Sequence, residues 1–130
     1  MGKRTIEIIF YRQKHLRPDW KVDIDSLQME LFLAELADDL ARFGIEIRRQ
    51  DNEAVVIEIN SYADVLNSVR ISSPAEGFAN VCVGHVIGKS PNLDLCEDIK
   101  RAVNRVAFAP DMVPPDDHNR RVCHNCGCGC

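Results

Sequence analysis

An apolar stripe with the spacing of an α-helix, between residues 25 and 44, is the feature that most limits what this chain can fold into. Asp25 stands where an N-cap is expected, with Gln28 three residues later as in a capping box, and Gly44 stands where a left-handed residue ends a helix. The stripe predicts an amphipathic helix that buries one face against other structure. Its apolar side chains recur every three or four residues, and they are Met29, Phe32, Leu33, Leu36, Ala37, Leu40 and Phe43.

Runs of β-branched and aromatic residues precede and follow this helix, as is typical of strands. The runs predict strands over 5–12, 45–49, 54–59, 68–72 and 80–87. Asp51–Asn52 predicts a turn between two of these strands, and residues 62–66 are expected to form one helical turn. A second helix is predicted to open at Ser90–Pro91 and to end at Pro110. Its apolar face consists of Leu95, Ile99, Ala102, Val103 and Val106.

This order of elements, β-α-β-β-β-β-α, predicts an α/β domain with a single mixed sheet and two main helices. A thioredoxin-like layout fits the order, and so does an α+β two-layer sandwich with both helices on one face. If the strands flanking the first helix are parallel neighbours, that helix is a crossover connection between them. The chain beyond the second helix is predicted to be an irregular C-terminal tail.

Three segments of the chain differ in composition. Residues 1–109 contain the apolar runs and predict one globular domain, the size expected from a chain of 130 residues. Residues 110–122 contain three prolines and several charges, which predicts a Pro-rich linker. Residues 123–130 read CHNCGCGC and form a Cys-rich tail.

Overall charge and hydropathy exclude several classes of protein. The net charge is −4, so the surface as a whole gives no reason to expect nucleic acid as a partner. No run of the sequence approaches the ~20 apolar residues of a membrane span, and the apolar run near the N-terminus is too short for a signal peptide. We therefore expect a cytoplasmic protein. In the cytoplasm thiols stay reduced, so clustered cysteines there indicate metal or thiol chemistry.

The tail contains the strongest chemical signal in the sequence. Its four cysteines are Cys123, Cys126, Cys128 and Cys130, and two glycines between them let the backbone fold tightly around one centre. Arg120 and Arg121 precede the cluster and favour ionised sulfur, which is the form that binds metal. Four thiolates complete a tetrahedral zinc site, and His124 is able to replace one sulfur. Because all four cysteines fall within eight residues, copper(I) and an iron–sulfur cluster compete with zinc.

Two alternatives to metal binding stay open for the tail. The first is thiol–disulfide exchange, in which Cys123 and Cys126 or a neighbouring Cys-Gly-Cys step cycles between dithiol and disulfide and passes electrons to a partner. The second is a tail that binds nothing important or bridges two chains by adventitious oxidation.

The two remaining cysteines are weaker candidates. Cys82 and His85 form a C-x-x-H pair, but on a strand their side chains would point to opposite faces, so Cys82 is expected to be a core residue. Cys96 lies at the start of the second predicted helix, where the positive helix end lowers a thiol pKa. Cys96 is therefore a secondary candidate for thiol chemistry, and the simpler interpretation is that it packs in the hydrophobic core.

Four stretches of the chain resemble the thioredoxin-like superfamily, and within it an uncharacterised cysteine-rich branch of small prokaryotic proteins. They span residues 5–98 and read TIEIIFYR, LARFGIEIRRQ, LNSVRISSP and VIGKSPNLDLCED. The resemblance implies a thioredoxin-like fold. It also implies a C-x-x-C after the first strand, but that region reads KHLRPDWKVDID and has no cysteine, which places the thiol chemistry in the tail.

The sequence as a whole predicts a small protein that binds or handles a soft metal and is not itself an enzyme. Its partners are expected to be the metal ion and a protein that receives metal or electrons. A thiol–disulfide redox protein that works through the same tail cysteines is the alternative function.

Overall fold

The computed structural model describes residues 4–15, 26–74, 78–87 and 94–112. Within these ranges the chain forms one four-stranded sheet and four α-helices. In chain order the elements are β1 (Arg4–His15), α1 (Leu27–Ala41), β2 (Ile45–Ile59), α2 (Tyr62–Asn67), β3 (Val69–Ser73), β4 (Phe78–Cys82), α3 (Val83–Ile87), α4 (Leu95–Phe108) and a 3-10 turn, η3 (Pro110–Met112). The prediction of an α/β protein with a single mixed sheet is confirmed.

The sheet joins a parallel pair of strands to an antiparallel pair. Its strand order is β2-β1-β3-β4, with β1 parallel to β2 and antiparallel to β3, and with β3 antiparallel to β4. Because β1 and β2 are parallel neighbours, α1 is the crossover connection between them, as predicted. The β2-β1 half is thus a β-α-β unit, and the β3-β4 half is an antiparallel pair that leads into α3 and α4.

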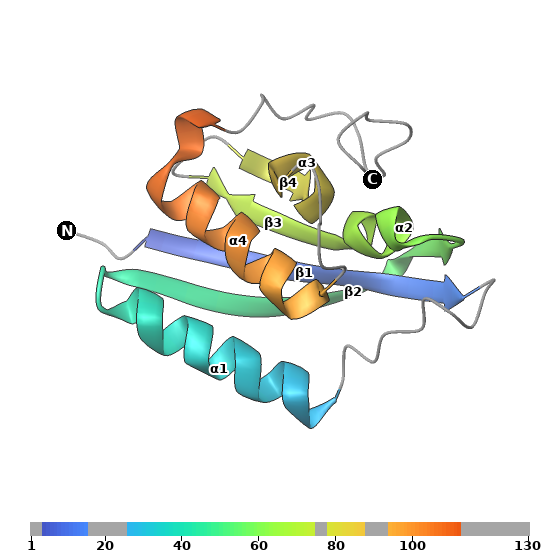
Figure 1. Ribbon diagram of the computed structural model, residues 1–130, viewed down its shortest axis with the longest axis horizontal. Coiled ribbons are helices and arrows are strands. Elements are labelled where there is room, and N and C mark those ends of the chain that lie inside the picture. The colour runs from blue at the N-terminus through green and yellow to red at the C-terminus, as the bar shows by residue number, and fades with distance from the viewer. Residues whose placement is uncertain (1–3, 16–25, 75–77, 88–93, 113–130) are drawn as a thin grey trace.

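The hydrophobic core lies between the sheet and the two long helices, which occupy the same face of the sheet (Figure 1). Alternate residues of β1 point into it, and Ile6, Ile8 and Phe10 are each at most 2% exposed. The helices contribute fully or almost fully buried side chains, among them Leu36, Leu40, Ile99 and Val103. The intervening β1 residues, such as Ile9 and Tyr11, therefore point to the opposite face of the sheet.

The two ends of α1 differ in detail from the prediction. Ser26 caps the helix, since its Oγ accepts a hydrogen bond from the Met29 N–H at 3.2 Å, whereas the predicted cap, Asp25, lies outside the described residues. Gly44 has a φ of 73° and takes the left-handed conformation expected of it. Phe43 was expected in the buried stripe, but it lies beyond the helix end, is 65% exposed and packs edge-on against Phe108 of α4 at 5.1 Å between ring centroids.

Helix α4 carries the predicted apolar face, and all five residues expected there are buried. Within the described residues the helix begins at Leu95, where Asp94 accepts a hydrogen bond from the Glu97 N–H at 3.2 Å. The expected opening at Ser90–Pro91 lies outside those residues. No helix in the described ranges is long and apolar enough to cross a bilayer.

Strand β2 is continuous, so the prediction of two strands separated by a turn is wrong. Tyr11 pairs with Asn52 and the next residue of β1 pairs with Val56, so a segment of β2 is left out of the pairing. Asn52 Oδ1 accepts a hydrogen bond from the Ala54 N–H at 2.9 Å, which is local turn chemistry. The turn signal at Asp51–Asn52 therefore produces an irregularity within one strand, because β1 is long enough to pair on both sides of it.

The predicted strand over 80–87 is also wrong in its second half. Strand β4 ends at Cys82, and the following residues form the short helix α3. Four of its five residues, Val83, Gly84, Val86 and Ile87, are buried. A short apolar run of this kind is compatible with a buried strand and with a buried helix. In the structure this segment is helical and packs against α4.

Candidate functional site

The predicted metal ligands lie outside the described residues. This holds for Cys123, Cys126, Cys128, Cys130 and His124. It also holds for Arg120 and Arg121, which were expected to tune the charge of the thiolates, and for residues 113–122 of the predicted linker. The first three linker residues form η3. The metal site formed by the tail cysteines therefore stays a prediction.

Cys96 occupies the first turn of α4 and is half-buried against the hydrophobic core. Burial raises the pKa of its thiol above the ordinary value, and the nearby Asp94 carboxylate raises it further. The direction is opposite to the one expected from the helix end. Because the thiolate is the reactive form, Cys96 is a poor nucleophile and a poor metal ligand at neutral pH.

We expect Cys96 to react slowly with iodoacetamide at neutral pH, and its rate to keep rising with pH beyond the range in which an unperturbed thiol has levelled off. Asp94→Asn removes one negative charge but retains a capping side chain, so it is expected to raise the rate at pH 7 by about twofold. The measurement is alkylation followed by mass spectrometry, with the tail cysteines replaced by serine.

Glu97→Gln is the matched control, because this carboxylate shares the helix turn but is not a cause of the raised pKa. It is expected to leave the alkylation rate unchanged. A wild-type Cys96 that reacts faster than free cysteine at pH 7 contradicts the assignment.

Cys82 is 2% exposed and lies at the junction of β4 and α3. Its Sγ accepts a hydrogen bond from the His85 N–H at 3.2 Å, so the sulfur caps the short helix. The expectation that Cys82 is a core residue is confirmed. The reason given for separating it from His85 was wrong, since the two residues do not share a strand.

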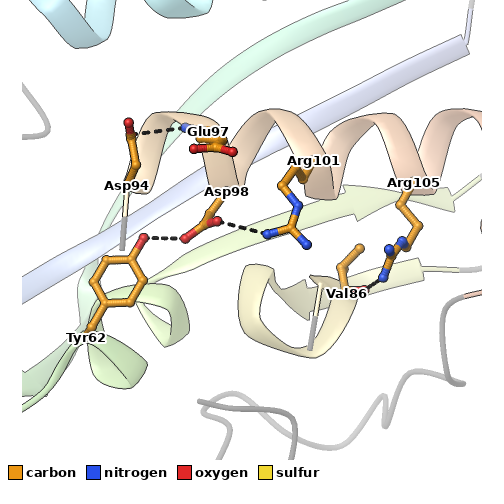
Figure 2. A network of polar contacts seen from close by, with 7 residues as sticks. All are labelled: Tyr62, Val86, Asp94, Glu97, Asp98, Arg101 and Arg105. Atoms are coloured by element: carbon orange, nitrogen blue, oxygen red, sulfur yellow. Dashed lines mark hydrogen bonds and ion pairs between the residues drawn. The ribbon is translucent and has the colours of Figure 1, made fainter. Parts of the chain in front are cut away.

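A polar network connects α4 to the two short helices (Figure 2). Asp98 is 2% exposed and accepts hydrogen bonds from the Tyr62 hydroxyl at 2.5 Å and from Arg101 Nη1 at 3.4 Å. One turn further along, Arg105 Nη1 donates to the Val86 carbonyl at 2.9 Å. The network therefore joins α2 and α3 to the buried side of α4.

Sequence reasoning missed Tyr62 and Asp98. A signal was present for Asp98, because it lies three residues after Leu95 and four before Ala102, inside the apolar stripe of its helix. A carboxylate at such a position requires a partner from another element, and Tyr62 is that partner.

A second buried polar group lies on the sheet face that α1 and α4 do not cover. Arg70 of β3 is 2% exposed, although its place in an alternating strand predicts a solvated side chain. Its Nε and Nη2 donate to the carbonyl and the Oδ1 of Asn67, at 2.8 and 2.5 Å, and its guanidinium lies 5.4 Å from the Tyr11 ring centroid. No local sequence signal distinguishes this arginine from an exposed one.

A shallow cavity of about 240 Å³ lies between the end of α1 and the start of β2. Its lining includes the apolar side chains of Ala37, Ala41 and Ile45, and its polar side chains are the carboxylates of Asp38 and Glu46. It contains no histidine or cysteine. The cavity therefore offers neither a nucleophile nor a soft-metal site.

Within the described parts of the chain, no group of three or more His, Cys, Asp or Glu side chains is placed to hold a metal ion. Comparisons of the chain with protein-family models, with curated proteins and with solved structures gave no match.

Proposed function

We propose that the protein binds or handles a soft metal ion through the thiolates of its C-terminal tail. The observation that carries this proposal is the set of four cysteines within the last eight residues, Cys123, Cys126, Cys128 and Cys130. Thiolates at such short spacing hold zinc, copper(I) or an iron–sulfur cluster, with His124 as an additional ligand. Arg120 and Arg121 offset part of the negative charge of the thiolate cluster.

The properties of the other two cysteines support the tail as the place of thiol chemistry. Cys82 is buried and its sulfur caps a helix, and the pKa of the Cys96 thiol is raised. Cys82 is therefore a structural residue, and the raised pKa makes Cys96 a poor source of thiolate at neutral pH. The four tail thiols are the remaining candidates.

The thioredoxin-like fold is part of the same proposal. It is supported by the β-α-β unit formed by β1, α1 and β2, followed by the antiparallel strands β3 and β4 and the closing helix α4. This arrangement favours the second candidate function, a thiol–disulfide redox protein whose tail dithiol passes electrons to a partner protein. In both functions the protein acts in the cytoplasm, needs a protein partner to receive metal or electrons, and has no catalytic residue of its own.

Elemental analysis after anaerobic purification without chelators separates the two functions. Metal handling predicts about one stoichiometric metal centre per chain, as four thiolates provide one tetrahedral shell. The redox function predicts a metal-free protein whose tail forms a disulfide that a reductant reverses and that Cys126→Ser abolishes. A metal-free protein with no reversible tail disulfide contradicts both.

A further inference from the structure

Strand β2 lies at one edge of the sheet, so one side of it has no neighbouring strand among the described residues. The strand order is β2-β1-β3-β4, and within the described ranges β2 pairs with β1 alone. Its first half, residues 45–52, pairs with β1 without interruption, and the irregular part of the strand follows. The N–H and C=O groups along a regular free edge pair readily with another strand. Residues 45–52 are therefore a template for one more strand.

Helix α1 has an exposed apolar face in addition to the face that it buries in the core. Leu27 is 68% exposed and Leu31 is 59% exposed, although both are large apolar side chains. Ala34 and Ala41 are also exposed and continue the same face, because residues three, four or seven apart lie on one side of a helix. The helix packs on β2, along the β2 side of the sheet (Figure 1). Apolar side chains that gather on an exposed face mark an interaction surface.

The shallow cavity between α1 and β2 joins this helix face to the edge of the strand. It is lined by Ala37 and Ala41 of α1 and by three consecutive residues of β2, which are Ile45, Glu46 and Ile47. Consecutive residues of a strand point to opposite faces of the sheet, so a cavity that touches all three opens at the edge of β2. Its volume of about 240 Å³ leaves room for an aliphatic side chain from a neighbouring molecule.

The charges along residues 45–52 complement a second copy of the same strand. Arg49 and Asp51 lie two residues apart and form an ion pair at 3.2 Å, so they share one face of β2. In an antiparallel pair centred on Gln50, Arg49 of each copy is opposite Asp51 of the other, and Arg48 is opposite the uncharged Asn52. Centring the pair on Arg48, Arg49 or Asp51 places like charges opposite each other, which destabilises pairing. The charge pattern therefore favours the register centred on Gln50.

We propose that the protein forms a homodimer in which the β2 strands of two copies pair antiparallel about Gln50, so that two four-stranded sheets become one continuous sheet. The α1 helices then lie antiparallel across the two-fold axis. The half of each helix that contains Leu27 and Leu31 faces the half of the other that contains Ala37 and Ala41, beside the cavity. This interface uses the same surface of both copies and covers the strand edge and the leucines together. It goes beyond the function proposed for the tail and does not depend on it.

Sedimentation equilibrium of the full-length protein tests the dimer, with a reductant and a chelator present to exclude dimers formed by tail disulfides or metal. We expect twice the monomer mass, with a dissociation constant in the micromolar range or below. Leu31→Glu is expected to weaken the dimer at least about tenfold, because it places a carboxylate in an apolar interface. Phe108→Glu is the matched control, since it makes the same kind of change at a 52% exposed apolar side chain of α4, and it is expected to leave the dimer unchanged. A wild-type protein that stays monomeric up to millimolar concentration overturns the proposal.

Disulfide crosslinking tests the register, in a background with the four tail cysteines replaced by serine. Gln50→Cys places the two new thiols beside each other on the two-fold axis, within reach of a disulfide, so oxidation with copper phenanthroline is expected to give mostly covalent dimer. Glu58→Cys is the matched control, because it is also exposed on β2 but its two copies would lie roughly 50 Å apart. If the protein is dimeric and Gln50→Cys crosslinks no better than this control, the copies meet through another surface and the proposal is wrong.

Discussion

Replacing Asp98 with alanine is expected to lower the free energy of unfolding by about 2–3 kcal/mol. The carboxylate is 2% exposed and accepts a hydrogen bond from the hydroxyl of Tyr62, which is itself 7% exposed. Its removal takes an acceptor from a buried hydroxyl and leaves a small void beside α2. The ion pair with Arg101 adds little, because more than a third of the Arg101 side chain is exposed to solvent.

The measurement is urea unfolding followed by circular dichroism. Asp39→Ala is the matched control, because it also removes a helical carboxylate but from an exposed position on α1. We expect it to change the free energy of unfolding by at most about 0.5 kcal/mol.

Tyr62→Phe is expected to lower the free energy of unfolding by about 1 kcal/mol. The double variant should cost less than the sum of the two single changes, since both remove the same hydrogen bond. Additive costs would mean that this bond does not couple α2 to α4.

Replacing all four tail cysteines with serine is expected to remove the bound metal completely and to leave the stability of the domain unchanged within about 0.5 kcal/mol. The buried hydrophobic cluster of the described residues extends from Ile6 to Ala107, so this part of the core is formed by residues that precede the tail. A metal bound outside that core has a similar affinity for the folded and the unfolded domain. Its loss therefore has little effect on the free energy of unfolding.

Metal content by elemental analysis and thermal unfolding by calorimetry measure the two effects on the same samples. Cys96→Ser is the control that removes a thiol from the domain, and it is expected to retain the metal. A four-serine variant that keeps its metal places the site elsewhere in the chain. A four-serine variant that loses several kcal/mol would show that the tail belongs to the folded unit.

Local sequence patterns predicted the main framework correctly because those patterns act over a few residues. The apolar stripes of α1 and α4 are set by the helical repeat, and the β-branched runs before and after α1 predicted the β-α-β unit that β1, α1 and β2 form. The chemistry assigned to the tail depends on the spacing of its cysteines alone, and it stays a prediction that metal analysis has to test.

The same patterns failed where distant residues decide the outcome. The turn signal at Asp51–Asn52 did not end a strand, because β1 pairs on both sides of it, and the run over 80–87 divided between β4 and α3. Whether such a segment forms a strand, a turn or a helix depends on the element that packs beside it. A window of neighbouring residues does not contain that information.

The sequence by itself therefore determined the class of fold, the two long helices and the thiol-rich tail, since these follow from periodicity and residue chemistry. Only the tertiary structure decided which polar groups are buried. Asp98 meets Tyr62 across 36 residues of chain, and Arg70 lies against Tyr11 of another strand. A carboxylate or a guanidinium is buried only where the fold supplies its partners, and those partners come from elements that are distant in the sequence.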